Sequence, residues 1–272
     1  QLFFHKIGGF ALSQTSPIII YVYTTLTVVA LYGNYMLIVM GVQTLMTAMF
    51  NSMNAGIGNL VAEGDKRKIM SVFAELFSIR FLFSCIMCFG VLMITPAFVS
   101  FWIGKKYVMD SLSLLLMTAI LFVNLSRTTV DAYINAYGLF GDIWAPIVEA
   151  SLNVGLSIIL GYYFGLHGVL SGVLISLLLV VFCWKPYYLF RKGLDERLSI
   201  YIFMYARHLM AALLCGVIVC LGMRYSMVQG DTTFFDGLLG ILVFSILSTL
   251  TLLCVAPGMR NLMRRFIRMC HV

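Results

Sequence analysis

Charged residues are scarce in this chain. Only 11% of its 272 residues are Asp, Glu, Lys or Arg, whereas 61% are hydrophobic. A soluble domain carries about 25% charged residues. A single soluble core cannot hide so much apolar surface, so we expect lipid to be the solvent for much of it. The scarcity of charge therefore excludes an ordinary soluble domain and predicts an integral membrane protein.

The sequence also lacks the motifs of common catalytic and metal-binding sites. It holds no Walker A sequence, no GxSxG and no HExxH. Its four histidines are scattered, and no loop is long enough for a soluble catalytic domain. Cys85 and Cys88 have CxxC spacing, but no second pair or histidine cluster completes a zinc set. We expect no enzyme activity, no metal and no cofactor.

The first residues lack the charged segment, short apolar segment and cleavage site of a signal peptide. The chain starts at Gln1 within an apolar pattern. We therefore expect it to be a piece of a longer protein.

Long apolar stretches predict an all-α fold, a polytopic transmembrane helix bundle with about eight spans. Each span needs about 20 mostly apolar residues. The stretches run approximately over residues 10–31, 34–60, 70–99, 111–136, 143–164, 167–190, 201–222 and 233–256. Charged or glycine-rich turns separate them, at 33–34, 63–68, 103–107, 138–142, 165–168, 191–197 and 224–231.

Basic residues are distributed unequally between the two sides of such a bundle. One side holds only Lys105, Lys106 and Arg224. The side with both chain ends holds Lys6, Lys66, Arg67, Lys68, Lys185, Arg191, Lys192, Arg197, Arg260, Arg264, Arg265 and Arg268. The positive-inside rule places this second side in the cytoplasm. Topology and attraction to membrane lipids account for the net charge of +7, so nucleic acid is not an expected partner.

The last residues, 260–272, interleave arginines with apolar side chains. Two interpretations stay open. The segment is either an amphipathic helix on the anionic inner leaflet or the ordinary basic flank of a span.

Polar residues recur at helical spacing inside three spans. The sets are Gln43, Thr47, Asn51, Asn54 and Gly58; Asn124, Arg127, Asp131 and Asn135; and Glu149, Asn153 and Ser157. Each set falls on one helical face. A single stripe of this kind is typical of helix–helix contacts. Three stripes, two with ionisable groups, favour a water-lined cavity.

The fourth and fifth spans are joined by the short turn 138–142, which predicts an antiparallel hairpin. At about 1.5 Å per residue, Asp131 and Glu149 share one depth and Arg127 lies about one turn deeper. An Arg127–Asp131 pair would fix the hairpin. Alternatively, Arg127 is an anion site beside a carboxylate that responds to a coupling ion. Arg80 is a second anion-site candidate if residues 70–99 are fully inserted, and otherwise snorkels to the interface.

The hairpin resembles the polysaccharide flippases of the multidrug, oligosaccharidyl-lipid and polysaccharide exporter superfamily. The matching residues between 124 and 186 are Arg127, Tyr133, Ala136, Gly138, Pro146, Glu149, Asn153, Gly165, Gly168, Val169, Trp184 and Pro186. Residues 5–38 resemble the seventh helix of these flippases and its exit into the eighth, and 54–68 the loop that follows. Family members often carry an acidic residue where Ser16 stands, so the resemblance does not extend to ion coupling there.

The resemblance implies the C-terminal half of a flippase. Residues 1–190 would form a six-helix C-terminal lobe, 191–256 two accessory helices and 257–272 a basic cytoplasmic tail. The substrate would be an undecaprenyl-pyrophosphate-linked oligosaccharide, moved across the bacterial inner membrane. Arg127 and Arg80 would meet pyrophosphate, and Asn51, Asn54, Asn124 and Asn153 sugar hydroxyls. The implied partners are membrane lipids, an N-terminal lobe of the same polypeptide and polysaccharide polymerase machinery.

Three other hypotheses are alternatives to a flippase. A multidrug antiporter of the same superfamily would favour acidic and aromatic cavity residues, whereas this sequence places Arg127 deep. A membrane enzyme of polysaccharide assembly would need a long extracytoplasmic loop or a histidine–carboxylate site. A non-transporting scaffold predicts that loss of buried charge harms folding alone.

Overall fold

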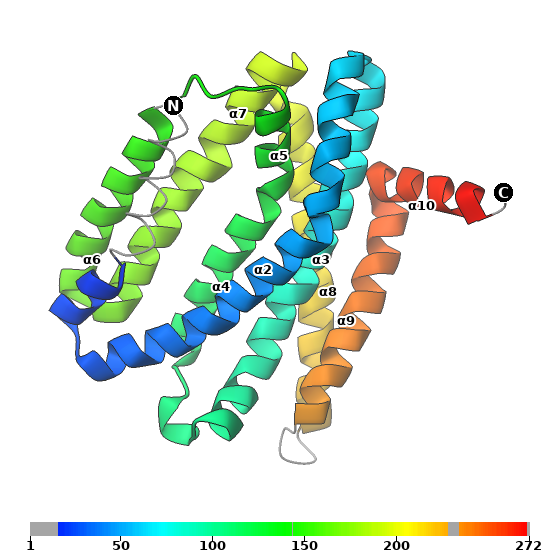
Figure 1. The fold of residues 1–272 in the computed structure, drawn as a ribbon. Helices are drawn as coiled ribbons and strands as arrows, with labels where there is room; N and C mark the ends of the chain where they lie inside the picture. The colour runs from blue at the N-terminus through cyan, green and yellow to red at the C-terminus, as the bar shows by residue number, and fades with distance from the viewer. Residues whose placement is uncertain (1–15, 143, 228–233, 271–272) are drawn as a thin grey trace. The chain divides into compact units, whose positions relative to one another are not determined.

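The computed structural model describes residues 16–142, 144–227 and 234–270 (Figure 1). Within these ranges every regular element is a helix and no strand occurs. In hydrocarbon each backbone N–H and C=O must find a partner within the chain, and a helix meets that need by itself. The predicted all-α class is confirmed.

The helices follow one another with short connections. After a first helical segment at residues 16–23, they are α2 (Leu26–Glu63), α3 (Lys66–Trp102), α4 (Ser111–Ser126), α5 (Thr128–Ala136), α6 (Trp144–Leu177), α7 (Lys185–Leu189), α8 (Leu198–Met227), α9 (Phe234–Val255) and α10 (Pro257–Cys270). A 3-10 turn lies at Lys105–Tyr107, and π-helical segments at Leu178–Trp184 and Phe190–Leu194 flank α7.

Six helical stretches among the described residues are long and apolar enough to cross a membrane. They are Leu26–Glu63, Lys66–Trp102, Ser111–Ala136, Trp144–Leu194, Leu198–Met223 and Phe234–Val255. A multi-pass membrane protein has this composition. The finer count of about eight spans stays a prediction, and residues 10–15 of its first span lie outside the described residues.

The stretch Trp144–Leu194 folds back on itself at Gly165. This residue has φ 56° and ψ −130°, a conformation that glycine adopts without a steric penalty. The Ser157 hydroxyl lies 3.3 Å from the Val169 carbonyl oxygen and donates to it, twelve residues along the chain. A Cβ atom on Gly172 would lie 2.6 Å from the Ser157 backbone nitrogen. Residues 144–164 and 166–177 therefore form two antiparallel arms in close backbone contact.

One predicted turn is wrong. The Gly33-Asn34 pair was expected to separate two spans, but α2 continues through it from Leu26 to Glu63. Glycine and asparagine each cost a helix about 1 kcal/mol or less. Breaking the helix inside an apolar run would leave several backbone groups without partners, which costs more. The break lies instead at residues 24–25, where the Thr24 hydroxyl donates to the Ile20 carbonyl at 2.6 Å.

The other predicted turns agree with the structure wherever they lie within the described residues. Breaks occur at Gly64-Asp65, at 103–110, at 137–142 and at 195–197, and Gly165 turns the chain in α6. The turn expected at 224–231 lies partly outside the described residues. Asp65 explains the start of α3, because its carboxylate accepts from the backbone N–H groups of Arg67 and Lys68.

The chain divides into two compact units. The first comprises residues 1–58 and 107–195, and the second comprises 59–106 and 196–272. Within the second unit, α3 packs on α8, α9 and α10. Phe77 lies at the centre of its aromatic core, with ring centroids 5.7 Å from Tyr201 and 5.2 Å from His208. The predicted boundaries at residues 190 and 256 stay a prediction.

Asp110 fixes the start of α4 in the first unit. Its carboxylate accepts from the Ser113 backbone N–H at 3.0 Å, and lies 2.8 Å from the His167 Nε2 atom beside the Gly165 turn. Burial opposes ionisation of Asp110, but the hydrogen bonds from His167 and Ser113 outweigh it and lower the pKa of the carboxyl from 3.8 to about 2. The stabilisation from this ionised carboxyl is complete above about pH 4 and is lost between about pH 4 and pH 2.

We expect Asp110→Ala to lower the unfolding free energy of the purified protein by about 1 kcal/mol, the usual value of an N-cap. Asp110→Asn is the matched control, because asparagine also caps helices and loses only the charge next to His167. Thermal unfolding in detergent, followed by thiol-reactive dye, measures both. Equal stability of Asp110→Ala and wild type would contradict the capping role.

Candidate functional site

A cavity of about 260 Å³ lies within the first unit. Its walls come from residues 16–43, α4, the Arg127 junction and both arms of α6. The lining residues are Ser16, Tyr32, Met36, Val39, Gln43, Met117, Ile120, Asn124, Arg127, Glu149, Asn153, Leu170, Val173 and Leu177. Apolar side chains and polar or charged groups both line this space, as they do in ligand sites.

Arg127 stands at the junction between α4 and α5. Its backbone stays close to helical, with φ −73° and ψ −17°, and its N–H donates to the Val123 carbonyl at 3.2 Å. The predicted stripe of polar residues on one face therefore persists across the junction. Arg127 thus reaches the cavity wall while Asp131, one turn further along, lies beside it.

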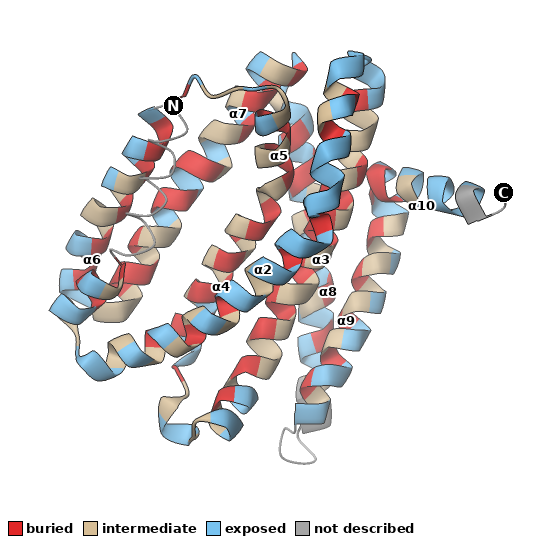
Figure 2. Ribbon diagram, viewed as in Figure 1, coloured by how far each residue is buried: buried red, intermediate tan, exposed pale blue. Residues whose placement is uncertain are grey.

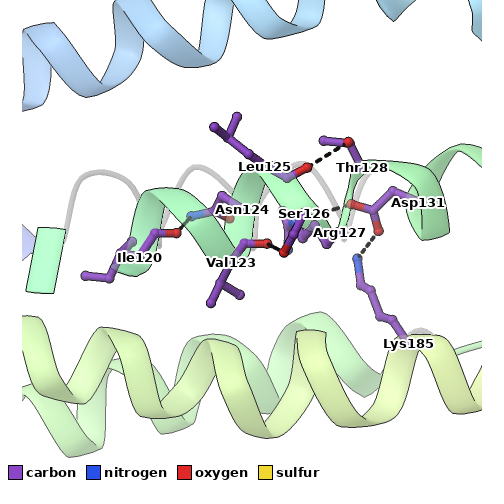
Figure 3. A network of polar contacts seen from close by, with 9 residues as sticks. All are labelled: Ile120, Val123, Asn124, Leu125, Ser126, Arg127, Thr128, Asp131 and Lys185. Carbon is purple, nitrogen blue, oxygen red and sulfur yellow. Dashed lines mark hydrogen bonds and ion pairs between the residues drawn. The ribbon is translucent and has the colours of Figure 1, made fainter. Parts of the chain in front are cut away.

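Asp131 holds two cations. Its Oδ2 atom lies 3.3 Å from the Nε atom of Arg127, and its Oδ1 atom accepts a hydrogen bond from the Lys185 Nζ atom at 3.2 Å (Figure 3). Lys185 reaches this carboxylate from α7, which ties α5 to α7. The predicted Arg127–Asp131 pair is present in the structure. The contact between Arg127 and Asp131 is made through the Nε atom of the guanidinium.

Glu149 and Asn153 lie one helical turn apart on the first arm of α6. Both side chains are buried, with exposures of 7% and 4%, and both line the cavity with Arg127. Asn124 lines it from α4, and its side-chain N–H₂ donates to the Ile120 carbonyl at 3.0 Å (Figure 3). Four predicted site residues are therefore gathered around one space: Arg127, Glu149, Asn153 and Asn124.

The remaining predicted residues lie elsewhere. Asn51 and Asn54 are exposed on α2, where the Asn54 amide donates to the Asn51 side-chain oxygen at 3.4 Å. Arg80 belongs to the second unit, in the middle of α3, and its side chain is only 2% exposed. None of the three lines the cavity described above. Their proposed contacts with substrate stay predictions.

Sequence reasoning missed the part that Lys185 plays. It counted this residue among the basic flanks that set the topology, but the side chain pairs with Asp131. Trp184 beside it packs on Trp144, with ring centroids 4.6 Å apart. A lysine next to tryptophan at a helix end usually marks an interface anchor. The partner of Lys185 becomes visible only when the structure places α5 next to α7.

The arrangement suits ligand binding by charge and hydrogen bonding. A guanidinium on the cavity wall can hold an anion, and a buried carboxylate can hold a proton or a cation. No group of three or more His, Cys, Asp and Glu side chains that could hold a metal ion occurs in the described part of the chain.

No known protein family, characterised protein or solved structure matches the chain.

Proposed function

We propose that this chain is the C-terminal part of a flippase that moves a lipid-linked oligosaccharide from the cytoplasmic to the periplasmic leaflet of the bacterial inner membrane. The observation that carries the proposal is one cavity between helices, on whose wall Arg127 and Glu149 stand together. In this proposal the chain has about eight spans and both of its ends are cytoplasmic. It is not an enzyme.

Arg127 supports an anionic substrate. A guanidinium offers a planar fork that matches phosphate oxygens. Arg127 lines the cavity, where a ligand could reach this group. A pyrophosphate carries two such acceptor groups. The substrate would therefore be an undecaprenyl-pyrophosphate-linked oligosaccharide, as the resemblance of residues 1–190 implies.

The size of the cavity sets its role. At about 260 Å³ it falls just below the range of about 300–1,000 Å³ that encloses a drug-sized ligand. It suits a pyrophosphate or one sugar, with Asn153 and Asn124 as hydrogen-bonding partners. The rest of a lipid-linked oligosaccharide would need a second lobe, which we propose to be an N-terminal lobe of the same polypeptide. Polysaccharide polymerase machinery would receive the product.

One observation favours a second candidate, a multidrug or cation antiporter of the same superfamily. Glu149 is a buried carboxylate on the cavity wall, and Tyr32 supplies an aromatic ring to the same wall. Carboxylate and aromatic groups together suit a lipophilic cation. The two candidates differ in the group that substrate needs, which is Arg127 in the flippase and Glu149 in the antiporter.

Complementation tests the flippase. A flippase-deficient bacterium receives the gene that encodes this chain with its flanking coding sequence, and surface polysaccharide is measured at matched membrane expression. We expect wild type to restore polysaccharide. We expect Arg127→Ala and Arg127→Lys to lose at least about tenfold, because lysine keeps the charge but not the bidentate fork.

Arg191→Ala is the control, because Arg191 is an exposed arginine that lines no part of the cavity. Full activity of Arg127→Ala would overturn the anion site. Failure of wild type, combined with resistance to lipophilic cations that depends on Glu149, would favour the antiporter.

A further inference from the structure

The helix α10 separates basic from apolar residues completely. Arg260, Arg264 and Arg268 recur every four residues and share one face. The opposite face is apolar and consists of Met259, Leu262, Met263, Phe266 and Ile267. The helix contains no acidic residue. Such a division is typical of a helix that lies in the plane of a membrane surface.

The position of α10 fits that plane. The 22 residues of α9, Phe234–Val255, extend about 33 Å at about 1.5 Å per residue, and the hydrocarbon core of a bilayer is about 30 Å thick. α10 begins two residues later, at Pro257. It therefore starts where a spanning α9 leaves the hydrocarbon. Figure 1 shows α10 turning away from the end of α9 and running across its direction.

Contacts within the second unit confirm the crossing. A Cβ atom on Gly258 would meet Ala74 and lie 2.7 Å from the Ser78 hydroxyl, so the start of α10 rests directly on α3. Seven residues later, Arg265 pairs with the buried carboxylate of Glu75 at 3.3 Å. Seven residues extend about 10 Å along α10, yet these contacts stay within one turn of α3. α10 therefore crosses α3 and does not run along it.

The apolar face of α10 is covered by protein at one end only. Met259 belongs to the core with Leu252, and Leu262 packs against that core. Phe266 and Ile267 continue the same face past these contacts and are 60% and 49% exposed. Figure 2 shows α10 buried near its start and exposed further along. The covered end faces the helices that cross the membrane, so the uncovered end faces the acyl chains beside them.

We propose that α10 is a binding site for anionic phospholipids at the membrane surface. Phe266 and Ile267 enter the acyl region, and Arg260, Arg264 and Arg268 bind the headgroup phosphates. Arg265 is the fourth arginine and serves a different purpose, because its pair with Glu75 holds α10 across α3. The charge of the ligand follows from three exposed arginines without an acidic neighbour on the helix. This proposal does not depend on the transported substrate.

Hydrogen–deuterium exchange of the full chain in nanodiscs tests it. The discs contain phosphatidylcholine alone, or phosphatidylcholine with phosphatidylglycerol. Each basic residue near an anionic surface contributes about fivefold to membrane affinity. We therefore expect peptides within 259–268 to exchange at least about tenfold more slowly with phosphatidylglycerol, and high salt to remove most of the difference.

Two variants make the test specific. The triple change Arg260→Gln, Arg264→Gln and Arg268→Gln is expected to abolish the effect of phosphatidylglycerol. The control Lys66→Gln, Arg67→Gln and Lys68→Gln removes the same charge from the exposed first turn of α3 and is expected to keep the effect of phosphatidylglycerol.

Equal loss in both variants, or no effect of phosphatidylglycerol on wild type, would overturn the proposal. Protection by free pyrophosphate in detergent to the same extent would assign the arginines to soluble phosphates and overturn it as well.

Discussion

Gly172→Ala is expected to reduce sharply the fraction of protein that stays folded after heating, although it adds one methyl group to an apolar helix. The new Cβ atom would lie 2.6 Å from the Ser157 backbone nitrogen and 2.8 Å from the Leu156 carbonyl carbon. These are backbone atoms of the opposite arm, so no side chain can rotate away. Forced overpacking in a well-packed core costs about 1–3 kcal/mol or more. The two arms must move apart, which also weakens the hydrogen bond from Ser157 to Val169.

Gly155→Ala provides the matched control on the first arm, because a Cβ atom there would have no heavy atom within 4 Å. Alanine favours a helix by about 1 kcal/mol over glycine, so this control should be neutral or slightly stabilising. Size-exclusion chromatography of a fluorescent fusion, with a thermal challenge before loading, measures the folded fraction of both. If Gly172→Ala is as stable as Gly155→Ala, the arms do not touch and Trp144–Leu194 is a straight helix.

The two arms that meet at Gly165 show how much of the fold the sequence could predict. Apolar runs long enough to cross a bilayer, separated by short polar turns, predict the fold class. Backbone groups without hydrogen-bond partners are costly in hydrocarbon, so such runs must be helical. Gly165 was expected in a turn at 165–168, and the structure turns there. The Gly33-Asn34 pair looked equally disruptive and is helical. The residue types alone do not distinguish the turn at Gly165 from the helix at Gly33-Asn34. At Gly165 the turn is stabilised by the close packing of Gly168 and Gly172 against the opposite arm.

The candidate site was predictable along each helix and across one short turn, but not between helices that are distant in the chain. Helical spacing placed Arg127 with Asp131 and Glu149 with Asn153, and the short turn brought the two pairs together. The same spacing placed Asn51 and Asn54 on a polar stripe, yet both are exposed on α2. Periodicity reports which residues share a face. It does not show whether that face packs on another helix, lines a cavity or is exposed.

Asp131→Asn is expected to destabilise the purified protein by about 2 kcal/mol. The carboxylate lies between the Nε atom of Arg127 and the Nζ atom of Lys185, and its removal leaves two facing cations. Breaking a fully buried pair costs about 3–5 kcal/mol. All three side chains are 20–29% exposed, so solvent reduces that value. Glu63→Gln is the control, because its pair with Lys68 is about half exposed and such pairs contribute about 0–1 kcal/mol.

A double-mutant cycle then separates structure from transport. Lys185→Met alone should cost less than Asp131→Asn, because Asp131 keeps Arg127 as a partner. Combined with Asp131→Asn, it removes one of the two unpaired cations, so the double variant should be more stable than the sum of the single changes predicts by about 1 kcal/mol. Additive costs would show that Lys185 and Asp131 do not interact. If the double variant regains stability and also restores surface polysaccharide, Asp131 only holds α5 to α7. If it regains stability without transport, while Lys185→Met alone still transports, the carboxylate itself takes part in moving the substrate, because neither the fold nor the lysine then explains the loss.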